Sequence, residues 1–406
     1  MTVLVLNSGS SSLKFALVDP ETGKRALDGI AERIGGEDAT LTTRVQGSEE
    51  TVTLPRATHE AALHGLLERL DRLARAGLYR QVEGIGHRVV HGGEEFKESV
   101  LITDQVEASI LAAARLAPLH NPANLEGIRA ARAAFPHVPQ VAVFDTAFHQ
   151  TMEPRAFRYA VPEAWYRQYG VRKYGFHGTS YRYVAAQSAR KLGRAQSETQ
   201  LLIAHLGNGC SACAVRGGKS ADTTMGFTPL PGLVMGTRSG DVDPSLVAYV
   251  AGRRGVDADA VTRELNEHSG LFGVSGLSND MRTLLDARSQ GDPRAALAIE
   301  LFCYRLASWL LALCASLERL DALVFTGGIG EHAAAIRAEV VARLWPLGTR
   351  LDADANARHG VPTGRISAEG SVPVWVIATD EERMIALDTR RLTQAQGAPS
   401  SKDGDG

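Results

Sequence analysis

The chain has 406 residues, of which 44% are hydrophobic and 22% charged, and its formal net charge is −2. This length allows two domains with separate cores, and the small net charge gives no global attraction to nucleic acid or to an anionic membrane. The four cysteines indicate no disulfide framework, and the N-terminus enters an apolar strand at once, so we expect a reducing, cytoplasmic setting.

Short β-rich runs alternate along the chain with longer Ala/Leu/Arg segments of helical spacing. The predicted strands are Val3–Leu6, Phe15–Val18, Gly84–Val90, Val141–Phe144, Leu201–Leu206, Ala322–Phe325 and Val374–Ile377. The predicted helices include Glu60–Ala76, Gln105–Leu116, Tyr181–Leu192 and Arg294–Leu317. This alternation indicates an α/β protein, in which ligands bind in the loops that follow strand ends.

Two segments, Leu4–Val18 and Leu202–Val215, each show a strand, a Gly- and Ser-rich turn and a second strand. The repeat suggests a duplicated domain, although hairpin turns favour Asn and Gly in any case. The apolar run Ala307–Leu317 is too short to cross a bilayer and predicts a buried helix. Cys210 and Cys213 have no second pair, so we expect buried strand side chains and not a zinc or redox site. Residues 396–406 are predicted to form a disordered tail.

Three glycine-rich loops at predicted strand ends are suited to bind phosphate, because glycine lets backbone N–H groups approach an anion. They are Asn7–Ser12 with Lys14 beyond it, His205–Gly209, and Thr326–Glu331 before a helical pattern. Each alone is typical of an ordinary turn, but three together predict a nucleotide cleft. The chain has neither a Walker P-loop nor the protein-kinase motifs.

Four charged or titratable residues stand beside glycines or at strand ends: Arg88, Asp145, His177 and Arg238. A lone Arg is most often a surface residue and a lone His a structural one, but the repetition favours a functional set. Asp241 and Asp243 are candidates to cap a helix after Pro244.

This set of residues fits phosphoryl transfer. Arginines bind carboxylate and phosphoryl oxygens, and a histidine stabilises the transferring group. Mg²⁺ needs one or two carboxylates, which Asp145 and the segment Asp380–Glu382 offer. The alternative for that segment is an acidic helix N-terminus.

Nine motifs in this order resemble those of the acetokinase family, the acetate kinases of the actin/hexokinase/Hsp70-like ATPase superfamily. They are NSGSSSLKF, GHRVVHGG, VFDTAFH, YGFHGTS, HLGNG, MGFTPL, MGTRSGDVDP, FTGGIGE and TDEE, and they extend the resemblance from Met1 to about Arg391.

The resemblance implies a fold of two duplicated actin/ribonuclease-H-like α/β domains with an interdomain nucleotide cleft. The N-terminal domain would span 1–146 with a C-terminal helix near 383–395, and the nucleotide-binding domain 147–382. It also implies reversible, direct in-line, Mg²⁺-dependent phosphoryl transfer from ATP to acetate, giving ADP and acetyl phosphate, with Mn²⁺ as an alternative metal. The family forms homodimers, and no nucleic acid or membrane partner is expected.

The resemblance also assigns site residues by motif position. The catalytic set would be Arg88, Asp145, His177 and Arg238. Acetate would be held by Arg88 and an apolar pocket of Val90, Leu119, Phe176 and Pro229. The nucleotide would contact Ser10, Ser12, Lys14, His205, Leu206, Gly207, Asn208, Gly209, Asp280, Met281, Arg282, Gly328, Ile329, Gly330, Glu331 and His332. The metal would lie near Asn7 and Glu381.

Elementary chemistry qualifies one of these roles. A carboxylate nucleophile, with a pKa of roughly 4–5, is already ionised at neutral pH and needs no base. We therefore expect Asp145 to orient an arginine or a metal-bound water. Val90 leaves little room in the pocket and favours acetate, although one methylene is worth only ~1–3 kcal/mol, so propionate is expected to be a poor substrate.

The sequence departs from the family pattern at Tyr181, Pro231–Gly232 and His332, which bears on support for His177 and on nucleotide contacts. Three alternatives remain at this stage. One is a propionate or butyrate kinase. Another is a non-catalytic ATP-binding module on the same fold, and the third is a sugar kinase in which Asp145 is a true base.

Overall fold

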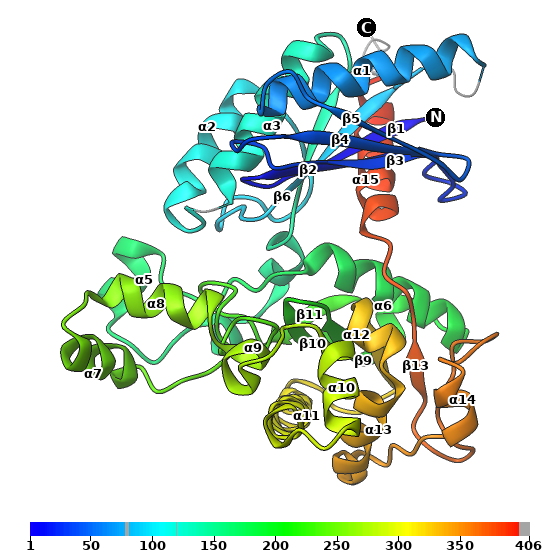
Figure 1. Ribbon diagram of the computed structural model, residues 1–406. Coiled ribbons are helices and arrows are strands. Elements are labelled where there is room, and N and C mark those ends of the chain that lie inside the picture. Colours follow the sequence, from blue (N-terminus) through cyan, green and yellow to red (C-terminus); the bar gives the residue numbers. More distant parts are fainter. Residues whose placement is uncertain (78–80, 119, 398–406) are drawn as a thin grey trace, which may run out of the picture. The chain divides into compact units, whose positions relative to one another are not determined.

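The structure is a computed structural model that describes residues 1–77, 81–118 and 120–397. The chain forms two compact units, one of residues 1–147 with the chain from Asp380 onward, the other of residues 148–379. Each unit has its own mixed sheet covered by helices (Figure 1). Residues 380–382, which the sequence analysis places in the second domain, lie in the first unit.

The first unit contains an eight-stranded sheet in the order β5-β4-β3-β2-β1-β6-β8-β7. β1, β6 and β8 are parallel, and the remaining neighbours are antiparallel. Its elements are β1 (Val3–Ser8), β2 (Ser12–Val18), β3 (Arg25–Glu32), β4 (Thr40–Val45), β5 (Ser48–Thr53), α1 (His59–Arg75), β6 (Gly84–Val89), β7 (Val100–Leu101), α2 (Asp104–Ala112), α3 (Asn121–Ala134), β8 (Gln140–Phe144) and α15 (Glu381–Gly397).

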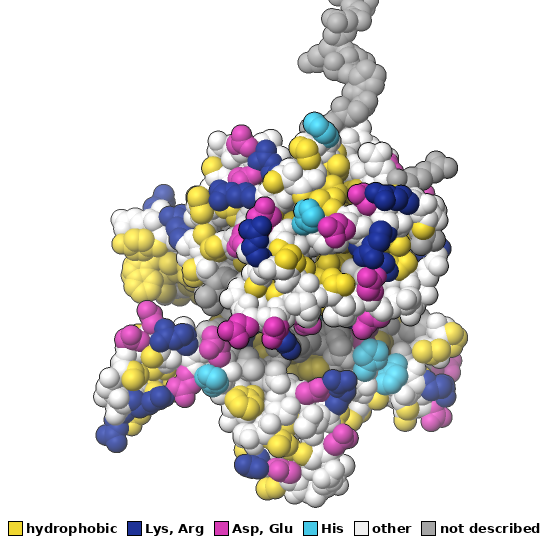
Figure 2. Space-filling view, turned by 45° about the horizontal axis from the view of Figure 1, so that its top comes forward, with side chains coloured by type: hydrophobic (Ala, Val, Ile, Leu, Met, Phe, Trp, Pro, Cys, Tyr) yellow, Lys and Arg dark blue, Asp and Glu magenta, His cyan; other side chains and the backbone are white. Residues whose placement is uncertain are grey.

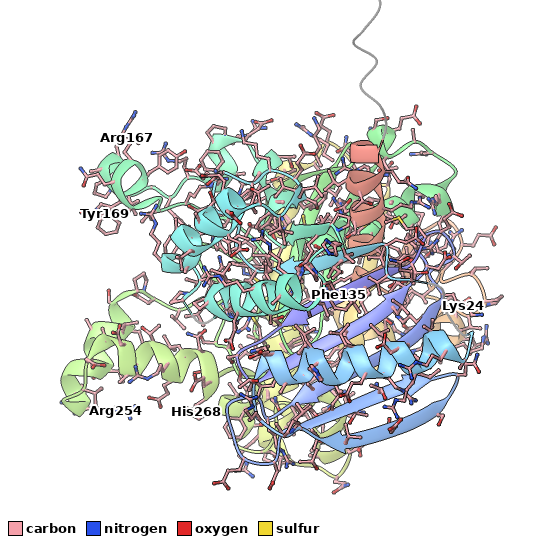
Figure 3. The ribbon with its side chains drawn as sticks, turned by 90° about the horizontal axis from the view of Figure 1, so that it is seen from above. Lys24, Phe135, Arg167, Tyr169, Arg254 and His268 are labelled. Atoms are coloured by element: carbon pink, nitrogen blue, oxygen red, sulfur yellow. The ribbon has the colours of Figure 1, made fainter. Side chains whose placement is uncertain are left out.

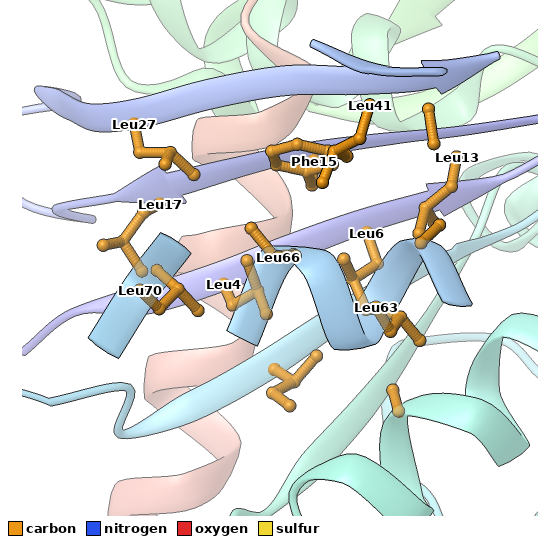
Figure 4. Close-up of a cluster of buried hydrophobic side chains, with 14 of the residues drawn as sticks. Leu4, Leu6, Leu13, Phe15, Leu17, Leu27, Leu41, Leu63, Leu66 and Leu70 are labelled. Carbon is orange, nitrogen blue, oxygen red and sulfur yellow. The ribbon is translucent and has the colours of Figure 1, made fainter. Parts of the chain in front are cut away.

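The alternation of side chains along β1 builds two cores, one on each face of this sheet. Leu4 and Leu6 face α1 and pack with Leu63 and Leu66, as Figure 4 shows. The intervening residues of β1 face the opposite way and pack against α15. Because strand side chains alternate with a period of two, one short strand anchors helices on both faces.

α15 begins at Glu381 and ends at Gly397, so it is longer than the helix predicted near 383–395. Its first turn is acidic, which favours a helix N-terminus. Gln396 and Gly397, predicted as part of a tail, are its last residues, and the rest of that predicted tail lies outside the described residues.

The second unit contains a five-stranded sheet in the order β11-β10-β9-β12-β13, in which β9, β12 and β13 are parallel. Its elements are α4 (Pro154–Phe157), α5 (Glu163–Tyr169), α6 (Gly178–Leu192), β9 (Gln200–Leu206), β10 (Cys210–Arg216), β11 (Lys219–Thr223), α7 (Ser245–Arg254), α8 (Ala258–Glu267), α9 (Gly270–Ser275), α10 (Met281–Ser289), α11 (Pro293–Leu313), β12 (Ala322–Thr326), α12 (Gly327–His332), α13 (Ala334–Arg343), α14 (Ala353–Ala357) and β13 (Val374–Val376).

The predicted internal repeat is present in the strand pairing. β1 and β2 form an antiparallel hairpin, and β1 also pairs in parallel with β6. β9 and β10 form the matching hairpin of the second unit, and β9 pairs in parallel with β12. Both units therefore place a polar hairpin turn beside the end of a parallel strand, as a duplicated fold requires.

Within the described residues, one helical stretch, Pro293–Ser316, is apolar and long enough to cross a membrane by length and composition alone. Its α-helical part, α11, packs against β9, β10 and helices α9, α10 and α13. The buried residues of α11 recur at helical spacing, which is typical of the core helix of a globular unit.

Cys210 and Cys213 are buried in β10, as expected for strand side chains. Burial raises the pKa of Cys210 to about 12, so its thiol is protonated at neutral pH.

Candidate active site

The first unit brings three predicted residues to the carboxyl ends of its parallel strands. Leu6 of β1 lies beside His87 of β6, and Arg88 of β6 lies beside Val143 of β8. This register places Asn7, Arg88 and Asp145 at the same edge of the sheet. The backbone N–H of Asp145 donates to the carbonyl of Val89 at 3.0 Å, which continues the pairing to the end of β8.

Arg88 and Asp145 form a two-pronged ion pair. Nη2 of Arg88 donates to Oδ2 at 2.6 Å, and Nε donates to the same carboxylate at 3.1 and 3.2 Å. Asp145 is 1% exposed, whereas the Arg88 side chain is 26% exposed. Burial by itself lowers the pKa of Arg88, but the charge and hydrogen bonds of Asp145 outweigh it and raise the pKa.

Arg88 retains donors for a ligand. A guanidinium has five N–H groups, and a third nitrogen, Nη1, donates to Oδ1 of Asn7 at 3.3 Å. Within the described part of the chain this leaves one N–H on each terminal nitrogen. Two such parallel donors match the two oxygens of a carboxylate.

Glu381, at the start of α15, completes an acidic group with Asp145. Burial, together with the charge of Asp145, raises the pKa of Glu381 to about 7, and Arg88 acts in the opposite direction. Two carboxylates and the amide oxygen of Asn7 thus share one Arg88, an excess of negative charge that a divalent cation relieves. The residues fit Mg²⁺, which takes oxygen ligands and needs few protein carboxylates. The described residues contain no cluster of three or more His, Cys, Asp or Glu arranged for a metal.

The turn between β1 and β2 carries the remaining first-unit residues predicted to meet phosphate. Ser10 and Lys14 are exposed, Ser12 is half-buried, and Lys14 pairs with Asn7 across the hairpin. The N–H of Gly9 donates to the carbonyl of Ser12 at 2.8 Å, which closes the turn.

Sequence reasoning missed the side chains that support this edge. Nδ2 of Asn124 donates to the carbonyl of Ser8 at 2.6 Å, and its Oδ1 accepts from the N–H of Val90 at 3.0 Å. A Cβ on Gly127 would lie 1.9 Å from Oγ of Ser8, so only glycine lets α3 approach the turn this closely. Asn121 and Asn124 in the segment HNPAN, two amides one helical turn apart, were the available signal.

The residues predicted to form the apolar pocket belong to different units. Val90 is buried in the first unit, and Phe176 and Pro229 belong to the second. Leu119 lies outside the described residues. The pocket remains a prediction.

In the second unit, His177 and Arg238 lie next to one glycine of the predicted phosphate loop. A Cβ on Gly209 would lie 3.4 Å from Nη1 of Arg238 and 3.7 Å from Nε2 of His177. Nη1 of Arg238 also donates to the carbonyl of Pro229 at 3.2 Å. Burial lowers the pKa of Arg238, but a guanidinium remains charged.

His177 is held in a defined orientation at the start of α6. Its backbone is left-handed (φ 58°), and its Nδ1 lies 2.8 Å from Oγ of Ser211. The hydroxyl of Tyr181, the departure from the family pattern, lies 2.5 Å from the same Oγ. Tyr181 and His177 thus share the Oγ of Ser211, which is the contact through which Tyr181 bears on the support of His177.

A cavity of about 540 Å³ opens beside the loop after β9. Its lining includes eight residues predicted to contact the nucleotide: Gly207, Asn208, Asp280, Met281, Arg282, Gly328, Ile329 and His332. Three further lining residues, Asn279, Leu285 and Ala333, were not predicted. A Cβ on Gly328 would meet nothing within 4 Å, so this backbone faces open space. The volume is typical of a site for a small molecule such as a nucleotide.

Leu206, Gly330 and Glu331, also predicted to bind the nucleotide, do not line this cavity and instead make contacts within the second unit. Leu206 is buried in β9. Oε1 of Glu331 accepts from the N–H of Gly327 at 3.0 Å, and the carbonyl of Gly330 accepts from Arg337. A Cβ on Gly327, which has φ +76°, would lie 2.8 Å from the carbonyl oxygen of Leu206.

Asp280 is the N-cap residue of α10, Asp243 bonds to the first residue of α7 from just before its N-cap position, and Asp241 does neither. Asp280 accepts from the N–H of Arg282 at the start of α10, and Asp243 accepts from the N–H of Ser245 at the start of α7. Asp241 instead accepts from the N–H of Gly232 and from the indole of Trp309.

Comparison with known proteins gives one consistent result. The model of the Acetokinase family matches residues 2–387. An acetate kinase of Stutzerimonas stutzeri (strain A1501) is 54% identical over 97% of this chain and 99% of its own length. A solved propionate kinase from Francisella tularensis and Porphyromonas gingivalis acetate kinase both superpose with a TM-score of 0.90, at 44% and 40% identity. Each match covers 96% of this chain and 99% of the other.

Proposed function

The chain belongs to the acetokinase family, and on this basis we propose that it is an acetate kinase that transfers the γ-phosphoryl group of ATP reversibly to acetate. It is a phosphotransferase with the duplicated actin-like ATPase fold predicted from its sequence. The products are ADP and acetyl phosphate.

The observation that carries the proposal is the way in which hydrogen bonds orient the guanidinium of Arg88. Asp145 fixes its guanidinium through Nε and Nη2, and two N–H groups on the terminal nitrogens remain for a substrate carboxylate. A sugar kinase would need its aspartate as a base for a hydroxyl, whereas here the aspartate is committed to an arginine. A module that only binds ATP has no need of such a group.

The reaction balances without a proton. One oxygen of acetate attacks the γ-phosphorus while the bond from that phosphorus to the β,γ-bridging oxygen breaks, and ADP leaves with the electron pair. Arg88 holds the acetate, and Asp145 orients Arg88. Arg238 and His177 stabilise the charge on the equatorial oxygens of the transferring group, which is the largest task of a phosphotransferase.

The nucleotide occupies the cavity lined by Asn208, Met281, Gly328 and Ile329, and the hairpin residues Ser10, Ser12 and Lys14 contact its phosphates. Asn7 and Glu381 hold Mg²⁺, for which Mn²⁺ can substitute. The bound metal supplies positive charge that shields the nucleotide phosphates.

Propionate is the second candidate substrate, because a solved propionate kinase is among the most similar structures. Val90, which is buried two residues after Arg88 in the chain, argues for the smaller acid, because a branched side chain in the proposed pocket leaves less room for a longer acid. The ranking of the two acids is therefore the sharpest question about the substrate.

We further propose a cytoplasmic homodimer without nucleic acid or membrane partners. Large apolar side chains of the second unit are exposed, among them Tyr249 at 68% and Tyr169 at 60%, and Figure 3 shows Tyr169 projecting from α5. On the face in view in Figure 2, positive and negative side chains are interspersed, in keeping with the net charge of −2. Sedimentation of the wild type and of Tyr249→Glu tests the dimer.

A hydroxamate assay tests the activity. Purified protein, Mg-ATP and hydroxylamine are mixed with acetate, propionate or butyrate, for the wild type and for Arg88→Ala. We expect most product from acetate, little from propionate, and loss of product in the variant. No hydroxamate from any acid, with ATP still bound, would favour the binding module or the hydroxyl kinase instead.

A further inference from the structure

A chain of hydrogen bonds in the second unit joins the nucleotide-binding turn to a histidine of the active site. Oγ of Ser180 lies 2.8 Å from Nδ1 of His205 and 2.8 Å from Oγ1 of Thr379. The backbone N–H of Thr379 donates to Oε1 of Glu331 at 3.4 Å, and the same oxygen accepts from the N–H of Gly327 at 3.0 Å. Thr379 therefore belongs to both parts of this hydrogen-bond network, because its hydroxyl bonds to Ser180 and its backbone N–H bonds to Glu331.

The chain continues from His205 to His177 through ring stacking. The two imidazoles stack with their centroids 4.3 Å apart and an interplanar angle of 26°. Nδ1 of His177 also lies 2.8 Å from Oγ of Ser211, so the ring is held both by a hydrogen bond and by the stacked His205. A stacked ring supports its partner only while its own rotation is fixed, and for His205 the hydroxyl of Ser180 does this.

We propose that Thr379 is a positioning residue for phosphoryl transfer. Its hydroxyl, through Ser180 and His205, holds the imidazole of His177, and its N–H ties the same assembly to the turn at Gly327. The proposal rests on the proposed function, in which His177 stabilises the transferring group.

Two arrangements of the protons on Thr379, Ser180 and His205 are compatible with these hydrogen bonds. If Thr379 donates to Ser180, then Ser180 donates to Nδ1 of His205, whose proton is on Nε2. If instead His205 carries its proton on Nδ1, it donates to Ser180, which donates to Thr379. In the first arrangement the loss of the Thr379 hydroxyl removes the donor to Ser180, and in the second it removes the acceptor of the Ser180 proton, so either loss weakens the hydrogen bond that orients His205.

The place of Thr379 in the chain adds to the argument. It is the last residue of the second unit, and Glu381, which we propose holds the metal, follows two residues later. Ser180 is wholly buried. At this point the hydroxyl of Thr379 serves His177 and its backbone N–H serves the turn at Gly327, whereas an apolar side chain of the same shape would keep only the second contact.

The experiment compares Thr379→Val, which removes the hydroxyl at nearly constant shape, with Thr379→Ser, which keeps it. The matched control is Thr349→Val, because Thr349 is a buried threonine whose hydroxyl donates to a backbone carbonyl outside the site. For Thr379→Val we expect kcat to fall about tenfold, the equivalent of one lost hydrogen bond, with the KM for ATP within about twofold of wild type. Thr379→Ser should regain most of the rate, and Thr349→Val should lose stability but keep kcat.

A second readout does not depend on activity. Side-chain ¹⁵N and ¹H NMR signals of His205 and His177 report tautomer and ring environment, and we expect both sets to shift in Thr379→Val and neither in Thr349→Val. Should Thr379→Val fail to fold, Thr379→Ala removes the same hydroxyl without the branched side chain and is measured in its place.

Two results would overturn the inference: wild-type kcat with unchanged histidine signals in Thr379→Val, or Thr379→Ser as impaired as Thr379→Val. Wild-type protein that makes no acetyl phosphate would instead refute the proposed function, and the NMR comparison would still decide whether Thr379 orients His205.

Discussion

Asp145 holds Arg88 with both carboxylate oxygens, because Oδ2 accepts from Nη2 at 2.6 Å and from Nε at 3.1 Å. The other oxygen accepts from Nε at 3.2 Å. Both oxygens of Asp145 thus accept from the arginine, and the carboxylate is oriented toward Arg88. The role of Asp145 in this structure is therefore to orient Arg88.

Asp145→Asn should lower kcat by ~10²–10³, the usual loss for one preorganised electrostatic group. The amide places an N–H against an arginine donor, so Arg88 loses its fixed orientation. Steady-state kinetics measure the loss, and Asp321→Asn is the control, because Asp321 pairs with Arg194 and Arg319. If the kcat of Asp145→Asn instead falls to the uncatalysed rate and recovers only at high pH, Asp145 acts as a general base.

Arg88→Lys should fail to rescue Arg88→Ala. Lysine keeps the charge but cannot present two parallel donors to a carboxylate while it binds Asp145. We expect the kcat/KM for acetate to fall ~10²-fold or more in both variants, because neither side chain can hold Asp145 and present two donors to acetate at once. The affinity for ATP, measured by calorimetry, should change little. Near wild-type activity of Arg88→Lys would mean that Arg88 acts only as a point charge.

Gly328→Val should raise the KM for ATP, because its side chain enters the cavity beside Ile329 and His332. We expect an increase of ~10-fold or more, comparable to the loss of one well-packed contact group. Gly252→Val on α7 is the matched control, since it also meets open space but lies outside the cavity. Equal effects of the two substitutions on KM would place the nucleotide elsewhere.

Glu381 predicts a specific dependence of stability on pH. Its pKa is raised in the folded protein to about 7, above its ordinary value of 4.5, so the folded state binds more protons than the unfolded state between these values. Its contribution to stability is therefore fully present below pH 4.5 and is lost as pH rises toward 7 and beyond.

Thermal unfolding of the wild type and of Glu381→Gln, without divalent metal, measures this contribution. The melting temperature of the wild type should fall relative to that of the variant as pH rises through that interval. Mg²⁺ at pH 7.5 should restore the wild type and not Glu381→Gln, because the metal stabilises the carboxylate form. If the melting temperatures of the two proteins change with pH in the same way, with and without Mg²⁺, then Glu381 neither has a raised pKa nor binds the metal.

The sequence predicted the central strands of both sheets and their repeat because those strands are buried apolar runs, such as Val3–Leu6 and Leu201–Leu206. It missed β5, Ser48–Thr53, which is largely exposed and carries no apolar alternation. It also missed β3, where Asp28 and Gly29 interrupt the pattern. Pairing with a neighbouring strand fixes these segments, and that pairing is not visible locally.

The same limit applies to the site. Asn7, Arg88 and Asp145 were predictable because each lies at or just beyond the carboxyl end of an apolar strand, and parallel strands end at one edge. Asn124 was not, since it reaches Ser8 and Val90 from a helix distant in sequence. Leu285 and Ala333 line the cavity with side chains of no chemical signature.

The central claim is direct transfer from ATP to an acetate oxygen, and ³¹P NMR of the reaction with ¹⁸O-labelled acetate tests it most directly. We expect one new resonance, acetyl phosphate, displaced by the isotope shift of an ¹⁸O bonded to phosphorus, together with ADP. Unlabelled phosphate as the product, or AMP with pyrophosphate, would contradict attack by acetate on the γ-phosphorus.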